Sequence, residues 1–427
     1  MPKLLWVSPL SVHDTSNTSA LQMRNMLLSL RAREVEIVGL CALNFLHPSG
    51  TSMFTDLDEK LKGNETSFNL NDNNINFIYV RTKSRNLGDM ISQEQRDLYA
   101  KFCAIINSFR PDVVMGSGTD MLSMVCFDEA HRRGIPTVYT LLDGTPRRFN
   151  FPNIDVVITD STATANLYAN MQKINVVPVG SFIPVAGPLV SREEAAKVIT
   201  EAESAAKEGK INAEQVLARN PERNRITMIS PTLDKGVTIF TKLSQVAPAE
   251  AQKFKFTVYE TAPGQFKDNI AKATGTSFTE AELSKIEVLG PEVPSKEVLE
   301  STRLLVVPSL SFESIVTIAR EAIAHGIPVL ATNQIGIAES VGEAGVLVEL
   351  PPTCVRDHSA IPSTEELANF IKGMSIVLSE DMSARCARVT QRNEVNFSAN
   401  RLALILKPLF DKRAGNNPQL LRNGSLI

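Results

Sequence analysis

Short apolar runs alternate with helical patterns along most of this chain, and this alternation restricts the possible folds more than any other feature of the sequence. Seven runs rich in valine and isoleucine lie within residues 1–184, from KLLWVSPL to INVVPVGS. Segments with helical periodicity, such as SQEQRDLYAKFCAIINSF, lie between them. Buried strands that alternate with helices predict right-handed β-α-β units and a parallel sheet.

The alternation stops once and then begins again. Residues 185–222 are rich in Ala, Glu and Lys and predict a helical linker or insert, laid against the surface or bridging two domains. Strand-like runs return with RITMISP and continue to GVLVEL. We therefore expect two tandem doubly wound α/β domains facing a cleft, over residues 1–184 and 223–396. A helix at about 397–415 is expected to pack back on the first domain, and 416–427 reads as a loose tail.

Composition and charge exclude several classes of protein. A chain of 427 residues predicts more than one domain, and a net charge of −3 favours neither nucleic acid nor an anionic membrane as the main partner. No apolar run is long enough to span a bilayer, and the N-terminus does not resemble a signal peptide. Five scattered cysteines without a C-x-x-C pair favour a reducing cytoplasm over a disulfide framework or a zinc site. We expect a cytoplasmic protein, with peripheral membrane contact through LQMRNMLLSLRAR as the alternative.

The segment SFESIVTIARE carries the first candidate site residues. It follows the apolar run LLVVPSL and holds Glu313 and Glu321, with seven residues between them. Acids near the start of a helix are common, because they suit the helix dipole and glutamate is a good helix former. Here, however, they follow the carboxyl end of a predicted strand, where doubly wound sheets bind ligands.

These residues form part of a larger pattern. The C-terminal half resembles the donor-binding domain of retaining family 4 glycosyltransferases, which have the GT-B fold of two Rossmann-like domains and a pair of glutamates seven residues apart. The matching positions are Pro308-Ser309, Glu313, Glu321-Ala322, Gly326-Ile327-Pro328-Val329, Lys235-Gly236, Gly336 and Glu339. The resemblance runs through most of residues 225–350 and is fainter in the N-terminal half.

The resemblance implies roles for these residues on a nucleotide-diphosphate sugar. Glu313 is expected to face the donor sugar and Glu321 the ribose, since carboxylates accept hydrogen bonds from paired hydroxyls. Seven intervening residues in a helix would separate them by roughly 12 Å, comparable with the reach across a diphosphate. Lys235 is expected to place a compact positive charge at the phosphates, beside free amides at the helix start. The other expected donor-binding positions are Ser314, Ile315, Val316, Thr317, Ser230, Pro231, Gly236 and Gly336.

The sequence also departs from the family pattern. Ser314, Ile315 and Val316 stand where the family commonly has Gly-Phe-Gly, and Ile229 or Ser230 takes the place of an arginine before the lysine. Arg147 and Arg148 are candidates to supply that charge; a solvated surface pair is the alternative.

The N-terminal half is expected to bind the acceptor. The candidates there are His13, Asp14, Ser16, Asp143 and Gly180, and each has an ordinary loop or turn alternative. The DLD at Asp56–Asp58 reads as a solvated loop and not a metal site, and GSGTDM lacks the third glycine of a dinucleotide fingerprint.

We therefore predict a glycosyltransferase that moves a sugar from a nucleotide-diphosphate sugar, with retention of anomeric configuration and without a metal ion or bound cofactor. The alternatives are a catalytically degenerate GT-B protein that binds a nucleotide sugar or glycan as a regulator, and a GT-B nucleotide-sugar epimerase. A two-lobed solute-binding protein is a third alternative, which the lack of a signal peptide disfavours. The acceptor class stays open among glycans, lipids, small metabolites, proteins and modified nucleic-acid bases, and so does the oligomeric state.

Overall fold

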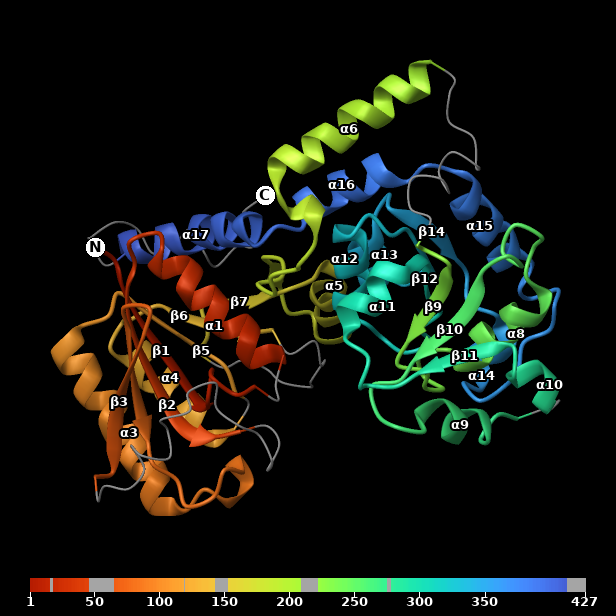
Figure 1. The fold of residues 1–427 in the computed structure, drawn as a ribbon. Helices are drawn as coiled ribbons and strands as arrows, with labels where there is room; N and C mark the ends of the chain where they lie inside the picture. Colours follow the sequence, from red (N-terminus) through yellow and green to blue (C-terminus); the bar gives the residue numbers. More distant parts are fainter. Residues whose placement is uncertain are drawn as a thin grey trace. The chain divides into compact units, whose positions relative to one another are not determined.

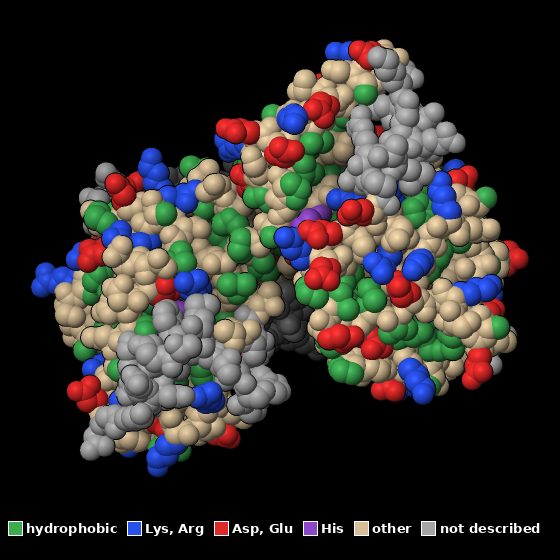
Figure 2. Space-filling model, viewed as in Figure 1, with side chains coloured by type: hydrophobic (Ala, Val, Ile, Leu, Met, Phe, Trp, Pro, Cys, Tyr) green, Lys and Arg blue, Asp and Glu red, His purple; other side chains and the backbone are tan. Residues whose placement is uncertain are grey.

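The computed structural model of this chain describes residues 1–15, 18–45, 65–118, 120–142, 153–208, 222–274 and 278–412. The chain divides into two compact units, each built on one mainly parallel sheet with helices packed on it (Figure 1). The N-terminal unit comprises Met1–Ile183 and Val395–Ile427, and the C-terminal unit comprises Pro184–Glu394. On the face shown in Figure 2, acidic and basic side chains are mixed over both units.

The N-terminal unit has an eight-stranded sheet in the order β3-β4-β2-β1-β5-β6-β7-β8. Its strands are β1 (Lys3–Leu10), β2 (Glu36–Asn44), β3 (Ser67–Asp72), β4 (Ile75–Val80), β5 (Val113–Gly116), β6 (Thr137–Leu141), β7 (Val156–Thr159) and β8 (Val176–Pro178). Its helices are α1 (Thr18–Arg31), η1 (Leu87–Asp89), α3 (Ser92–Phe109), α4 (Met121–Arg132), α5 (Thr162–Gln172) and α17 (Val395–Lys412). Each of the seven apolar runs forms one of these strands, as predicted.

Both faces of this sheet are covered, which explains the continuous apolar runs. Successive residues of a strand point to opposite faces. Leu4 and Trp6 of β1 therefore pack in the core on one face, and Leu5 and Val7 in the core on the other. Helix α17, near the end of the described chain, contributes to the same core as Trp6 and contacts α1.

Strand β3 corrects the prediction of a purely parallel sheet. It pairs antiparallel with β4 at the edge of the sheet, and the two are joined by Asn73 and Asn74, both with positive φ. Asparagine adopts this conformation more readily than most residues, and it favours tight hairpin turns. The burial of β3 alternates along the strand, as expected when one face is solvated.

The C-terminal unit has a six-stranded, entirely parallel sheet in the order β11-β10-β9-β12-β13-β14. Its strands are β9 (Arg225–Ile229), β10 (Lys255–Tyr259), β11 (Ile286–Leu289), β12 (Thr302–Val307), β13 (Val329–Thr332) and β14 (Gly345–Val348). The chain winds outward from β9 to β11, then returns to the other side of β9 and continues through β12 to β14. The carboxyl ends of β9 and β12 therefore form a topological switch point, where open α/β sheets bind ligands.

Helices complete the C-terminal unit. They are η2 (Pro188–Val190), α6 (Arg192–Lys207), α8 (Val237–Val246), α9 (Gln265–Ile270), α10 (Glu280–Leu283), α11 (Ser295–Ser301), α12 (Thr317–Ala324), α13 (Ile335–Val341), α14 (Pro352–Arg356), α15 (Ala368–Ser379) and α16 (Ser383–Arg392). Helix α6, from the Ala/Glu/Lys-rich segment, packs against α16 within this unit. None of the described helices has the length and hydropathy needed to cross a membrane, and all five cysteines are free thiols.

Candidate functional site

The two glutamates of the segment SFESIVTIARE lie in different local structures. Strand β12 ends at Val307, and helix α12 begins only at Thr317. Glu313 therefore lies in the loop between them, whereas Glu321 lies within α12. The prediction that one helix carries both glutamates is wrong, and a helical rise of roughly 12 Å does not describe their separation.

Two glycines allow this loop to lie close to its neighbours. Gly236 has a φ of +80°, which favours glycine, and a Cβ there would overlap the carbonyl oxygen of Pro308. A Cβ at Gly336 would overlap the carbonyl oxygen of Glu313. The amides of Leu310 and Ser311 donate to the carbonyl of Asp234, at 2.8 and 3.2 Å. The loop after β12 is thus held against the segments before α8 and at the start of α13.

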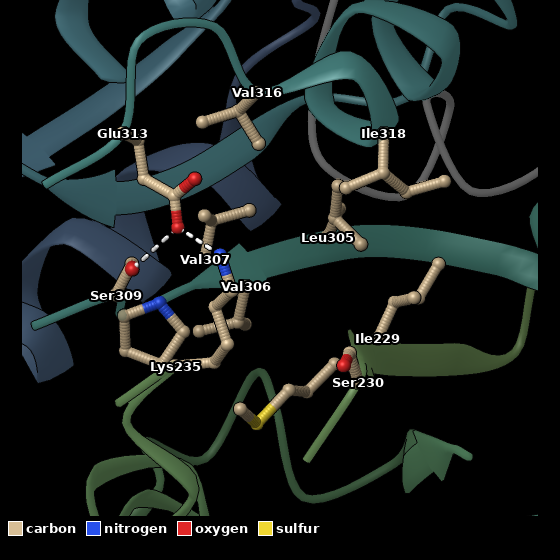
Figure 3. Close-up of a pocket in the computed structure, with 12 residues that line it drawn as sticks. Ile229, Ser230, Lys235, Leu305, Val306, Val307, Ser309, Glu313, Val316 and Ile318 are labelled. Carbon is tan, nitrogen blue, oxygen red and sulfur yellow. Dashed lines mark hydrogen bonds and ion pairs between the residues drawn. The ribbon is translucent and has the colours of Figure 1, made fainter. Parts of the chain in front are cut away.

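This packing brings a cation to Glu313. The Lys235 Nζ forms an ion pair with the Glu313 carboxylate, and the Ser309 hydroxyl donates to the same carboxylate oxygen at 2.9 Å (Figure 3). The side chains of Lys235 and Glu313 are 35% and 15% exposed, so the pair is accessible without being fully solvated.

A pocket of about 100 Å³ lies beside this ion pair, at the switch point. Its polar lining consists of Ser230, Lys235, Ser309 and Glu313. Apolar side chains from β9, β12 and the region where α12 begins form the rest, as Figure 3 shows around Ile318. Ligand pockets typically measure about 300–1,000 Å³, so this pocket accounts for only part of a large ligand's site.

A serine on α13 fixes the residue before α12. The Ser340 hydroxyl accepts from the Val316 amide at 2.9 Å and donates to the Gly336 carbonyl at 2.8 Å. The prediction of a free amide at Val316 is therefore wrong. The amides from Thr317 onward in the first turn of α12 have no acceptor within the helix, because helix geometry provides none for them. Sequence reasoning missed Ser340, because nothing in the sequence links it to a residue on another element.

The remaining donor-site candidates lie around this cluster. Ser230 follows β9 with a φ of +59°, and its hydroxyl accepts from the side-chain amide of Gln265 at 3.3 Å. Pro231 is buried next to it, and Ser314 is buried after Glu313. Glu321 is half-buried on α12 and does not line the pocket. The assignment of these residues to a donor stays a prediction.

His13, an acceptor-site candidate, is part of a buried network in the N-terminal unit. Its Nδ1 lies 2.6 Å from the Tyr79 hydroxyl and its Nε2 lies 3.0 Å from the Asp72 carboxylate, which also accepts two hydrogen bonds from Arg24. Burial lowers the pKa of His13, although Asp72 partly opposes the shift. Burial alone would raise the pKa of Asp72, but the hydrogen bonds from His13 and Arg24 hold it well below its usual value.

Of the other N-terminal candidates, the structure describes Asp14 and Gly180. Asp14 is buried, and Gly180, with a φ of +96°, packs against Ser398 of α17. Ser16, Asp143, Arg147 and Arg148 lie outside the described residues, as does Asp56–Asp58. In the described part of the chain, no cluster of His, Cys, Asp and Glu side chains is arranged to hold a metal ion.

One family model matches the part of the chain that holds this site. Residues 227–359, which include Lys235, Glu313, Glu321 and Gly336, match the family model described as "Glycosyl transferases group 1". No curated protein sequence matches the chain.

Solved structures with a similar fold cover almost the whole chain. A glycosyltransferase from Rickettsia africae is 13% identical with a TM-score of 0.60, over 97% of this chain and 99% of that one. Anabaena HepE in complex with UDP is 16% identical with a TM-score of 0.57, over 96% and 100%. An Escherichia coli structure titled "Trehalose-6-phosphate", bound with UDP-2-fluoro glucose, is 12% identical with a TM-score of 0.54, over 96% and 99%. The predicted fold class, two Rossmann-like domains of the GT-B type, is confirmed.

Proposed function

We propose that this chain transfers a sugar from a nucleotide-diphosphate sugar to an acceptor, with retention of anomeric configuration and without a metal ion. The observation that carries this proposal is the cluster of Lys235, Glu313 and Ser309 at the β9/β12 switch point. It lies within the residues that match the group 1 glycosyltransferase model. A cation and a carboxylate at this place suit the two chemically different ends of a sugar diphosphate.

Lys235 supplies the charge that the leaving diphosphate requires. A lysine ammonium is a compact point charge, and the N-terminus of α12 adds backbone amides and the positive end of a helix dipole nearby. Together they stabilise negative charge as the sugar–phosphate bond breaks. The diphosphate replaces Glu313 as the partner of Lys235.

Glu313 then becomes available to the sugar. An ionised carboxylate is an acceptor only and binds paired hydroxyls through charge-assisted hydrogen bonds. The Ser309 hydroxyl holds one oxygen of the Glu313 carboxylate in place. In this mechanism the acceptor attacks from the face of the leaving group, and the departing phosphate takes the acceptor's proton. The protein contributes mainly positioning and charge stabilisation.

The similar structures suggest the donor to test first. HepE is described in complex with UDP and with UDP-glucose. A uridine diphosphate sugar is therefore our first choice of donor.

The test is release of nucleoside diphosphate from a panel of nucleotide sugars, with and without a mixture of candidate acceptors. We expect release that depends on the acceptor and persists in EDTA. Activity lost in EDTA and restored by manganese would contradict metal independence. An epimerised nucleotide sugar without release would favour an epimerase, and tight binding without turnover would favour a degenerate binding protein.

A further inference from the structure

The loop after β12 is hydrogen-bonded at both ends to the segment formed by the end of β13 and by α13. The carbonyl oxygen of Ser309 accepts from the Thr332 hydroxyl at 2.8 Å and from the side-chain amide of Gln334 at 2.7 Å. At the other end of the loop, the Val316 amide donates to the Ser340 hydroxyl at 2.9 Å. This one segment therefore fixes both ends of the loop that holds the candidate site.

The side chain of Gln334 bonds to this loop instead of capping its own helix. Gln334 is the N-cap residue of α13, a position where a side chain often accepts from an amide of the first turn, and it makes no such bond. It donates instead to the Ser309 carbonyl. The Ser309 hydroxyl in turn donates to the Glu313 carboxylate (Figure 3). Gln334 therefore fixes the residue that orients Glu313.

The Ser340 hydroxyl fixes the start of α12. It accepts from the Val316 amide and donates to the Gly336 carbonyl. Ser340 is only 1% exposed, so water does not compete for either bond. Val316 directly precedes α12. Its bond to Ser340 therefore determines where the free first-turn amides of α12 begin, and such amides suit a phosphate group.

Between these two attachments the backbones are in direct contact. Gly336 lies so close to the carbonyl oxygens of Glu313 and Ser314 that a Cβ atom there would overlap both. A loop that is bonded at both ends and packed along its middle has few other conformations available. Such preorganisation matters for catalysis, because an error of about 1 Å in placing a reacting group can cost about a hundredfold in rate.

We propose that Gln334 and Ser340 are positioning residues of the candidate donor site. Gln334 acts through Ser309 on the carboxylate of Glu313, at the sugar end of the donor. Ser340 acts through Val316 on the start of α12, at the diphosphate end. Neither residue contacts the donor in this proposal. The inference rests on the proposed function, which supplies the donor, and adds separate roles for two side chains that the sequence pattern did not single out.

Two variants remove these hydrogen bonds with little change in side-chain shape, and two matched controls remove bonds of the same kind elsewhere in the unit. The variants are Gln334→Met and Ser340→Ala. The control Gln252→Met deletes a side-chain amide that donates to a backbone carbonyl at 3.3 Å. The control Thr390→Val deletes a buried hydroxyl that donates at 2.9 Å to the carbonyl four residues earlier, as the hydroxyl of Ser340 does.

Hydrogen exchange of the full chain without ligand tests whether the two bonds hold the loop. Peptides that cover residues 308–318 are expected to exchange about threefold to tenfold faster in Gln334→Met and in Ser340→Ala, the factor for loss of a neutral hydrogen bond. Both controls are expected to leave these peptides unchanged. Exchange at the wild-type rate in both variants would overturn the proposal.

Calorimetry with UDP, GDP, ADP, CDP and dTDP, and initial rates with the matching nucleotide sugars, then test the two roles. Ser340→Ala is expected to raise the Kd for the nucleoside diphosphate that the wild type binds, about threefold to tenfold, with a smaller effect on kcat. Gln334→Met is expected to lower kcat by a similar factor and to leave that Kd nearly unchanged. If Ser340→Ala does not fold, Gln334→Met, a change of a half-buried side chain, carries the test alone.

The outcomes separate the proposal from the proposed function. A purely structural role would lower the unfolding midpoint of Gln334→Met and Ser340→Ala and leave the Kd and kcat of the folded protein at wild-type values. That result, in a wild type that binds and turns over a donor, would overturn the positioning roles and leave the proposed function standing. A wild type that binds none of the five nucleoside diphosphates would overturn both.

Discussion

At the scale of single residues, the two glutamates of the motif have different surroundings and should differ in function. Glu313 is held in a loop by Lys235 and Ser309, at the pocket. Glu321 lies on α12 and does not line that pocket. If Glu313 holds the reacting sugar, its interactions change as the ring gains positive charge. If Glu321 holds the ribose, its interactions stay the same throughout the reaction.

Steady-state kinetics with the identified donor separate these roles. Glu313→Gln is expected to lower kcat about tenfold to a hundredfold and to leave the Kd for free nucleoside diphosphate nearly unchanged. Glu321→Gln is expected to raise KM and that Kd by a similar factor, with little change in kcat. The reverse pattern would mean that the donor lies in the opposite direction, and no effect of either change would mean that neither glutamate binds the donor.

Lys235, Gly236, Glu313 and Gly336 were predictable from the sequence because they recur together in a spaced pattern. The contacts that hold these residues in place could not be predicted. The contacts of both glycines with carbonyl oxygens, and the link of Ser340 to Val316, join residues far apart in the chain. Such contacts follow from tertiary packing, which a single sequence does not reveal.

At the scale of elements, the start of α8 depends on a close backbone approach that can be tested by one methyl group. Gly236 and Gly264 precede α8 and α9 with φ values of +80° and +78°. A Cβ at Gly264 would meet only the Asp268 carboxylate at 4.0 Å, whereas one at Gly236 would overlap the Pro308 carbonyl. The two positions thus share a left-handed backbone conformation, but only Gly264 has room for a Cβ atom.

Alanine at each position separates these two effects. Gly264→Ala is expected to lower the free energy of unfolding by roughly 1–2 kcal/mol, the strain of a left-handed conformation. Gly236→Ala is expected to cost more and to displace the loop that carries Glu313, with a large loss of transferase activity. The measurements are urea unfolding and initial rates. Equal effects of the two changes on stability and rate would show that the Pro308 contact does not position the site.

Most elements could be predicted because apolar runs of buried parallel strands are distinctive, and all of those identified are strands in the structure. The start of α12 could not be placed, because Ser314–Val316 have no strong helix-starting signal and are fixed by Ser340 and Gly336. The edge strand β3 was missed because its alternating pattern is short, although the Asn73-Asn74 pair marks its turn.

At the scale of the whole molecule, each unit has its own core, and the single tryptophan reports on one of them. Trp6 lies fully buried in β1 of the N-terminal unit. It belongs to the same hydrophobic core as Phe77, whose ring contacts His13. The hydrogen bonds of His13 fit a neutral ring that donates to Asp72 and accepts from Tyr79, which Ser11 also contacts. Protonation of His13 would remove its acceptor.

The N-terminal unit should therefore lose stability as the pH falls. The folded-state pKa of His13 lies below its unfolded value of about 6.5, so below that pH the unfolded state binds more protons. We expect the free energy of unfolding to fall from pH 6.5 toward pH 5, by at most about 1.4 kcal/mol per pH unit for one proton. The depressed pKa of Asp72 adds a further loss only as the pH falls through about 4.

Urea unfolding followed by Trp6 fluorescence measures this dependence. His13→Gln, which cannot titrate, is expected to flatten the slope between pH 6.5 and 5 and to leave the loss below pH 4 in place. A slope that is unchanged in His13→Gln would assign the acid sensitivity to other groups.

The most direct test of the central claim, that the switch point of the C-terminal unit binds the diphosphate of a nucleotide sugar, is calorimetric titration of UDP, GDP, ADP, CDP and dTDP. Wild type and Lys267→Met, an exposed lysine change on α9 of the same unit, are expected to bind one of these with the same Kd. Lys235→Met is expected to bind it about tenfold to a hundredfold more weakly, because it loses the charge-assisted contact and leaves Glu313 uncompensated. Equal affinity of Lys235→Met and wild type, or no binding of any of the five to the wild type, would contradict the account.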